Sequence, residues 1–448
     1  MSARYDLIVR GGSVWAAGSI GNGASADIGV IGGRFAAIGD LRGATAASEI
    51  DARGLTVLPG VMDTQVHLRE PGLEYKEDLA SGTAGAALGG ITAVFEMPNT
   101  KPNTDTAERL ADKLARAQHR AWVDHAFYIG ATAENAEGLA ALEMLPGAAG
   151  VKVFMGSSTG SLLVADDATL TRVLRSGRRR VAVHCEDEQR LIERRALIPA
   201  QGAHPRMHPM WRDEMTALRA TTRLLTCARA ARRRVHVLHV TTAEEMELLR
   251  DHKDLATVEV LPQHLTLCAP ECYERLGTYA QMNPPIREQR HQDALWKAVR
   301  DGTVDVLGSD HAPHTREEKD RPYPESPSGL TGVQTLLPLM LDHVAKGRLT
   351  LERLIDLTSA GPQRIFGIVN KGRIARGYDA DLTIVDLKAT RTITNQWIAA
   401  KCGWSPFDGM TVTGWPKMTV VRGRLIMRDD QLIGTAAGEP IRFVEALP

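Results

Sequence analysis

Eight short runs of apolar and β-branched residues recur between about Leu58 and Phe366, each followed by a longer segment with a helical pattern. This alternation predicts repeated strand–helix units and a parallel sheet, and eight such units close a TIM barrel. The predicted strands are 61–68, 91–97, 121–130, 150–155, 181–186, 235–240, 257–262 and 304–310. We therefore expect an α/β fold with a TIM (β/α)8 barrel over residues 58–367.

Both ends of the chain carry a different pattern, in which short apolar strands are separated by glycine or aspartate turns. YDLIVRGGSV near the start is similar to KMTVVRGRLIM near the end. Such segments are too apolar to remain solvated tails. We expect residues 1–57 and 368–448 to form one small β-sandwich beside the barrel.

Composition and charge exclude several classes of protein. The chain has 54 Lys and Arg and 54 Asp and Glu, and this zero formal charge argues against a nucleic-acid partner. Its five cysteines, an odd number spread over 448 residues, indicate a reducing, cytoplasmic location and no disulfide framework. We expect no secretion signal and no membrane span, because no long uninterrupted apolar segment occurs.

Side chains able to bind metal stand where the predicted strands end. Gln65 and His67 are two residues apart, so in a strand both point to the same face. His184, His239 and Asp310 each end a further strand, and strand ends of a barrel share one rim. A single histidine there is more often structural, but several nitrogen and oxygen donors on one rim predict a metal site.

Lys152 lies within an otherwise apolar strand, GVKVFM, where an ammonium group is costly unless it is paired or chemically changed. One solution is carbamylation by carbon dioxide, which makes a carboxylate able to bridge two cations. The alternative is an ordinary lysine in a salt bridge with Asp310.

Four longer motifs, DTQVHLREPG, FEMPNTKPNT, MNPPIR and SDHAPHTREEK, resemble the dihydroorotase family of cyclic amidohydrolases. The resemblance implies reversible, metal-dependent hydrolysis of L-dihydroorotate to N-carbamoyl-L-aspartate, a step of pyrimidine (UMP) biosynthesis. It also implies a binuclear zinc centre. The implied ligands are position 65, His67 and Asp310 for one zinc, His184 and His239 for the other, and carbamylated Lys152 for both.

Gln65 departs from the family pattern, which has histidine at this position. An amide oxygen is a poorer zinc ligand than imidazole, so we expect the first site to be weak or empty and the chain to bind one or two zinc ions. One zinc is sufficient to activate water and polarise a carbonyl group.

Arg69 follows His67 by two residues, and we expect it on the same strand face, able to hold a carboxylate with two hydrogen bonds. The alternative for Arg69 is a salt bridge with Glu70 or Glu74.

The resemblance assigns roles to further residues. Asn99 in MPNT and His314 are expected to bind the substrate carboxylate together with Arg69. Asn283 in QMNPPIR and the segment 327–335 are expected to contact the ring, although Asn-Pro-Pro is equally typical of a plain turn. Asp310 is expected to be the catalytic residue that transfers the proton.

Two other functions remain open. A hydantoinase, dihydropyrimidinase or allantoinase is favoured by the KVFM motif and disfavoured by Arg69 and Asn99. A catalytically silent subunit that supports aspartate transcarbamoylase is suggested by Gln65. The expected partners are a small-molecule substrate and further copies of the chain in a homo-oligomer.

Overall fold

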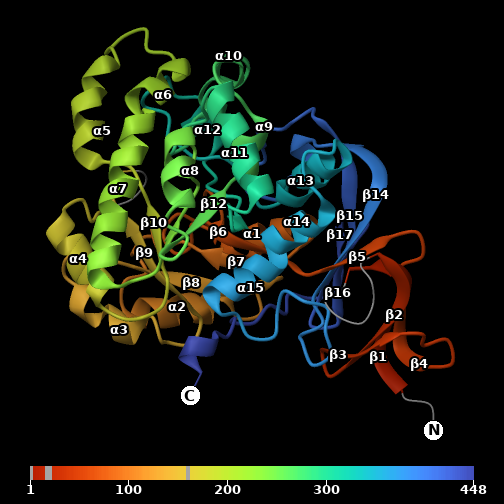
Figure 1. Cartoon of the computed structure of the whole chain (residues 1–448). Helices are drawn as coiled ribbons and strands as arrows, with labels where there is room; N and C mark the ends of the chain where they lie inside the picture. Colours follow the sequence, from red (N-terminus) through yellow and green to blue (C-terminus); the bar gives the residue numbers. More distant parts are fainter. Residues whose placement is uncertain (1–3, 16–22, 158–161, 448) are drawn as a thin grey trace.

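The computed structural model describes residues 4–15, 23–157 and 162–447, so the parts of the predicted terminal domain at 1–3, 16–22 and 448 lie outside the described residues. Eight parallel strands follow one another in sequence order around the barrel (Figure 1). They are β6 (Val61–Val66), β7 (Ile91–Glu96), β8 (Asp124–Gly130), β9 (Ala148–Phe154), β10 (Val181–His184), β11 (Val235–Val237), β12 (Ala256–Val260) and β13 (Val306–Leu307). A backbone bridge between Val66 and His311 joins the last strand region to the first, which confirms the predicted TIM barrel.

Helices pack around the outside of this sheet, and most begin at a side chain that accepts a hydrogen bond from the first helical turn. Asp78, Thr106, Asp166, Asp213 and Thr242 each cap a helix in this way. The longer barrel helices are α1 (Leu79–Leu88), α2 (Ala107–Ala117), α4 (Asp167–Arg175), α5 (Glu188–Arg194), α7 (Glu214–Ala231), α8 (Ala243–Arg250), α11 (Gln289–Asp301) and α13 (Leu336–Ala345).

The strands end earlier than the sequence predicted. The segment 304–310 contributes only β13, and β11 ends at Val237 rather than at residue 240. The cause is the backbone of the polar residues that follow, because His239 and Asp310 have positive φ values of 38° and 43°. A non-glycine residue with positive φ departs from the extended backbone of a strand.

Segments from both termini form a second unit, as predicted. Figure 1 shows the red N-terminal strands beside the blue C-terminal ones, in one nine-stranded mixed sheet. Its strands are β1 (Arg4–Val14), β2 (Ala24–Ile31), β3 (Arg34–Gly39), β4 (Thr45–Asp51), β5 (Thr56–Pro59), β14 (Leu382–Thr392), β15 (Thr411–Val421), β16 (Arg424–Arg428) and β17 (Gln431–Leu432). Antiparallel pairing of β5 with β14 joins the two halves, and Val9, Ile28, Ile384 and Val420 share one apolar core.

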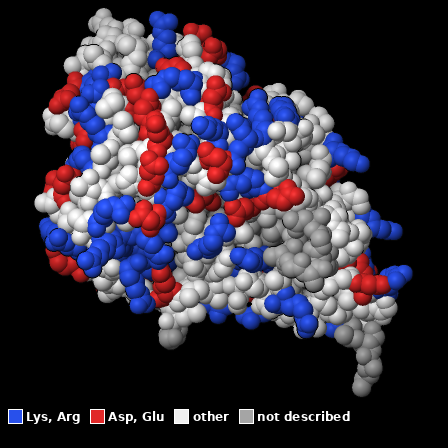
Figure 2. All heavy atoms as spheres, in the orientation of Figure 1, with Lys and Arg blue, Asp and Glu red and all other residues white. Residues whose placement is uncertain are grey.

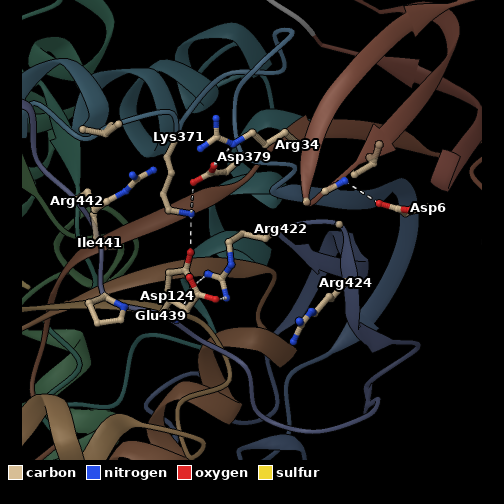
Figure 3. A pocket seen from close by; sticks show the side chains of 16 residues that line it. Asp6, Arg34, Asp124, Lys371, Asp379, Arg422, Arg424, Glu439, Ile441 and Arg442 are labelled. Atoms are coloured by element: carbon tan, nitrogen blue, oxygen red, sulfur yellow. Dashed lines mark hydrogen bonds and ion pairs between the residues drawn. The ribbon is translucent and has the colours of Figure 1, made fainter.

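A buried ionic network joins this sheet to the barrel. Lys371 Nζ lies 2.5 Å from Asp124, at the start of β8, and 2.6 Å from Asp381, just before β14. Arg422 also pairs with Asp124, and Figure 3 shows both cations reaching toward it. Because a buried charge must be paired, this network favours one fixed placement of the sheet on the barrel.

The surface is mixed in charge, with acidic and basic side chains interspersed over the face shown in Figure 2. No helix within the described part of the chain has the length and apolar character needed to cross a bilayer.

Candidate functional site

One cavity at the carboxyl ends of the barrel strands brings together the predicted metal-binding residues. It is lined by Gln65, His67, Lys152, Phe154, His184, His239, Asn283, Asp310, Ala312, Ser328 and Gly329. The three predicted carboxylate-binding residues lie beside it. Asn99 contacts His67, and Arg69 contacts His314, whose ring contacts Ser328 in the cavity lining. The fold therefore gathers all ten predicted site residues, which span 250 positions from 65 to 314 in the sequence.

Backbone strain is concentrated at this site. Arg69, His239 and Asp310 have φ values of 66°, 38° and 43°, a region that non-glycine residues rarely adopt. Such conformations cost about 1–3 kcal/mol each and persist where the surrounding structure enforces them. The side chains of these three residues are therefore aimed by the loops after β6, β11 and β13 rather than by strand geometry.

His184 and His239 form the first pair of candidate metal ligands. Nδ1 of His184 lies 3.1 Å from Nε2 of His239, and Nε2 of His184 donates to Glu186 Oε2 at 2.9 Å. Burial lowers the pKa of both histidines, so both rings are neutral near pH 7. The two nitrogens that face each other can therefore bind the same cation.

His67 and Asp310 form the second pair. The amide oxygen of Asn99 only accepts, so Nδ1 of His67, 2.8 Å away, carries the proton. Burial lowers the pKa of His67, and the neutral ring then turns an Nε2 lone pair toward Asp310 Oδ1 at 3.2 Å. Two acceptors that face each other at this distance suit a cation between them.

Gln65 changes the environment of this second pair. Its amide nitrogen donates to the same Asp310 oxygen at 3.0 Å, while its buried Oε1 has no hydrogen-bond partner. The amide therefore presents a hydrogen-bond donor to the carboxylate in the orientation that the structure shows, rather than a metal ligand.

Lys152 projects from β9 into the cavity and is almost fully buried. The expected alternative, a salt bridge with Asp310, is not formed, since no ion pair within 4 Å among residues 4–15, 23–157 and 162–447 includes Lys152. Its Nζ lies 4.3 Å from the centroid of the Phe154 ring. Burial lowers the pKa of Lys152 to about 7, so a large fraction of the amine is neutral at neutral pH.

The donor set fits a divalent cation, although not as one compact cluster. Across the described ranges, no three His, Cys, Asp or Glu side chains converge on a single metal position. The predicted ligands form the two pairs described above, with Gln65 and Lys152 as the additional donors. Among the described residues, the facing nitrogens of His184 and His239 hydrogen-bond only with each other, whereas at the His67–Asp310 pair the carboxylate already accepts from Gln65.

Arg69 is a buried guanidinium that has no carboxylate partner among the residues that the structure describes. Its Nε donates to Pro313 O at 3.1 Å, and its NH2 group lies 3.3 Å from His314 Nε2. The prediction that strand alternation places Arg69 was wrong, because Arg69 lies beyond β6 with a left-handed backbone. The alternative partners of Arg69 are occupied elsewhere, Glu70 by Arg120 at 2.7 Å and Glu74 by Arg116 at 3.8 Å.

Lys76 was missed by the sequence analysis, and its spacing carries no signal for it. It is buried, with Nζ 3.0 Å from His314 Nδ1 and 2.9 Å from Glu318. At this corner of the site, Lys76 and Arg69 therefore contact opposite nitrogens of the His314 ring, and the charge of Lys76 is balanced by Glu318.

The segment 327–335 reaches the same corner through Gly329. Its φ is +151°, and a Cβ there would lie 2.4 Å from Ala312 O and 3.0 Å from His314 Nε2, so only glycine fits. Asn283 lines the cavity, and its Oδ1 accepts from His208 Nε2 at 2.9 Å.

The chain resembles known proteins in sequence and in fold. Residues 56–426 match the model of the amidohydrolase family. The chain is 34% identical to a dihydroorotase of Methanothermobacter thermautotrophicus (91% of this chain, 92% of the relative) and 36% identical to one of Methanosarcina acetivorans (91% and 89%).

Among solved structures, an L-hydantoinase (dihydropyrimidinase) from Arthrobacter aurescens superposes with a TM-score of 0.92 at 31% identity, over 98% of this chain and 99% of that one. The resemblance to dihydroorotases is thereby confirmed, and amidohydrolases generally bind divalent metal ions. The chain belongs to the amidohydrolase family and is a hydrolase of cyclic amides.

Proposed function

We propose that this enzyme is a dihydroorotase, which interconverts L-dihydroorotate and N-carbamoyl-L-aspartate in cytoplasmic pyrimidine biosynthesis. The observation that carries the proposal is Arg69, a buried cation next to the cavity whose charge has no carboxylate partner in the described structure. L-dihydroorotate supplies that carboxylate, whereas hydantoin and allantoin have none.

Arg69, Asn99 and His314 would bind the substrate carboxylate, with Lys76, paired with Glu318, contacting the other nitrogen of His314. Asn283 and the backbone around Gly329, which also line the cavity, would contact the ring. Asp310 would accept a proton from the attacking water and return it to the ring nitrogen that leaves. Gln65 and His67 contact only Oδ1 of Asp310, and Oδ2 enters no hydrogen bond among the described residues.

Zinc is the metal we propose, with His184 and His239 as its main ligands and His67, Asp310 and carbamylated Lys152 completing the centre. When bound, a divalent cation lowers the pKa of water and polarises the carbonyl group under attack. Carbamylation needs a neutral amine, which the buried environment of Lys152 supplies.

Hydantoinase activity is the second candidate, because the solved relative with a TM-score of 0.92 is an L-hydantoinase. The test is turnover of the purified protein with L-dihydroorotate, N-carbamoyl-L-aspartate, hydantoin and allantoin, with zinc supplied and with chelator. Chelator-sensitive turnover of the first two alone supports the proposal. Preferred turnover of hydantoin or allantoin would replace the dihydroorotase proposal with a hydantoinase-type or allantoinase-type activity. No turnover with zinc present favours the silent-subunit hypothesis.

A further inference from the structure

Glu186 lies two residues beyond His184, after the end of β10, and has no role in the proposed reaction. Its side chain is fully buried, and its Oε2 accepts from His184 Nε2 at 2.9 Å. A carboxylate in this position fixes both the rotation of the imidazole ring and the nitrogen that carries its proton.

Arg212 supplies the countercharge that keeps this carboxylate in place. It is 4% exposed, its NH1 pairs with Glu186 Oε2, and its NH2 donates to Ser157 O at 2.5 Å. Its own carbonyl accepts from Arg287 at 3.0 Å, so its backbone is also anchored.

We propose that Glu186, held by Arg212, is a positioning residue that prepares His184 to bind metal. With the proton held on Nε2, the lone pair of His184 is on Nδ1, the nitrogen that lies 3.1 Å from His239 Nε2. Glu186 thereby orients the ring and increases the basicity of Nδ1. This inference rests on the metal centre of the proposed function.

The chain contains a matched pair that lacks this role. Glu143 is fully buried and pairs with the buried Arg233, but its contacts are with Arg178, Arg179 and Arg233 and with no histidine of the site. Replacing Glu143 therefore removes the same kind of buried ion pair without touching a metal ligand.

The experiment measures the zinc affinity of the metal-depleted, full-length protein by competition with a chromophoric chelator. Glu186→Gln keeps an oxygen that can accept from Nε2, so we expect about tenfold weaker zinc binding, and Glu186→Leu removes the acceptor and should weaken binding about 100-fold. Glu143→Gln should keep wild-type affinity. The visible spectrum of the cobalt-substituted protein, which reports ligand number and geometry, should change in the Glu186 variants alone.

The outcomes separate this inference from the proposed function. A wild-type protein that binds neither zinc nor cobalt overturns the proposed metal centre and this inference with it. Wild-type binding with unchanged affinity in Glu186→Gln and Glu186→Leu, or an equal loss in Glu143→Gln, overturns the positioning role alone. If the Glu186 variants lose cooperative unfolding, Arg212→Lys replaces them as the test. Lysine keeps the positive charge but cannot contact Glu186 and Ser157 O at the same time as the guanidinium does. Unchanged zinc affinity in that variant also overturns the inference.

Discussion

Replacing Arg69 by methionine tests the basis of substrate choice in this enzyme. The guanidinium is 3% exposed and its two hydrogen-bond neighbours, Pro313 O and His314, carry no negative charge to balance it. Removing one member of a buried charge pair costs about 2–5 kcal/mol. At about 1.36 kcal/mol per factor of ten, Arg69→Met should lower kcat/KM for L-dihydroorotate by about 30-fold to 5,000-fold.

The assay compares L-dihydroorotate with dihydrouracil, which has the same ring without the carboxylate, as substrate or competitive inhibitor. Because dihydrouracil cannot use Arg69, its kcat/KM or inhibition constant should change less than about threefold. Arg116→Met, which removes a partly exposed arginine of α2, should leave both values unchanged. Equal losses of kcat/KM or of binding for both compounds would show that Arg69 supports the structure of the cavity and does not bind the carboxylate.

Two further predictions concern proton transfer and acid stability. Asp310→Asn should lower kcat by about 10²–10⁴-fold with little change in the binding of L-dihydroorotate, and normal turnover would remove Asp310 from its catalytic role. Burial lowers the pKa of His208 and His236 to about 3 and of His264 to about 4, so the unfolded chain binds more protons than the folded one below about pH 6.5. The free energy of unfolding should therefore fall between about pH 6 and 4, by up to about 4 kcal/mol per pH unit for these three histidines, and urea midpoints that do not move over this interval would contradict the argument.

The barrel was predictable because its strands are buried on both faces and read as nearly continuous apolar runs. Such runs predict the number and order of the strands. They do not predict where each strand ends, because apolar residues continue into the loops that position the site residues. Leu238 and Val240 illustrate this, as both are buried and apolar although β11 ends at Val237. The intervening His239 has a left-handed backbone that is incompatible with the strand, and no residue pattern predicts this conformation.

The gathering of the predicted site residues around one cavity was likewise predictable from motifs, whereas the contacts that support them were not. Glu186 stands in the motif VHCEDE and could have been recognised from its spacing to His184. Arg212 and Lys76 could not, because their partners are 26 and 238 residues away in sequence and meet them only through the fold of the loops.

Gln65 makes the two halves of the proposed metal centre unequal, and this has a measurable consequence. At the His184–His239 pair, Glu186 accepts from His184, and the facing nitrogens hydrogen-bond with each other. At the other pair, the Gln65 amide donates to Asp310 Oδ1 at 3.0 Å and partly replaces the positive charge that a metal would supply there. We therefore expect about one tightly bound zinc per chain, measured by elemental analysis after dialysis against a weak chelator. Gln65→His exchanges that amide for an imidazole and should raise the content toward two, whereas an unchanged content would mean that position 65 does not face the metal.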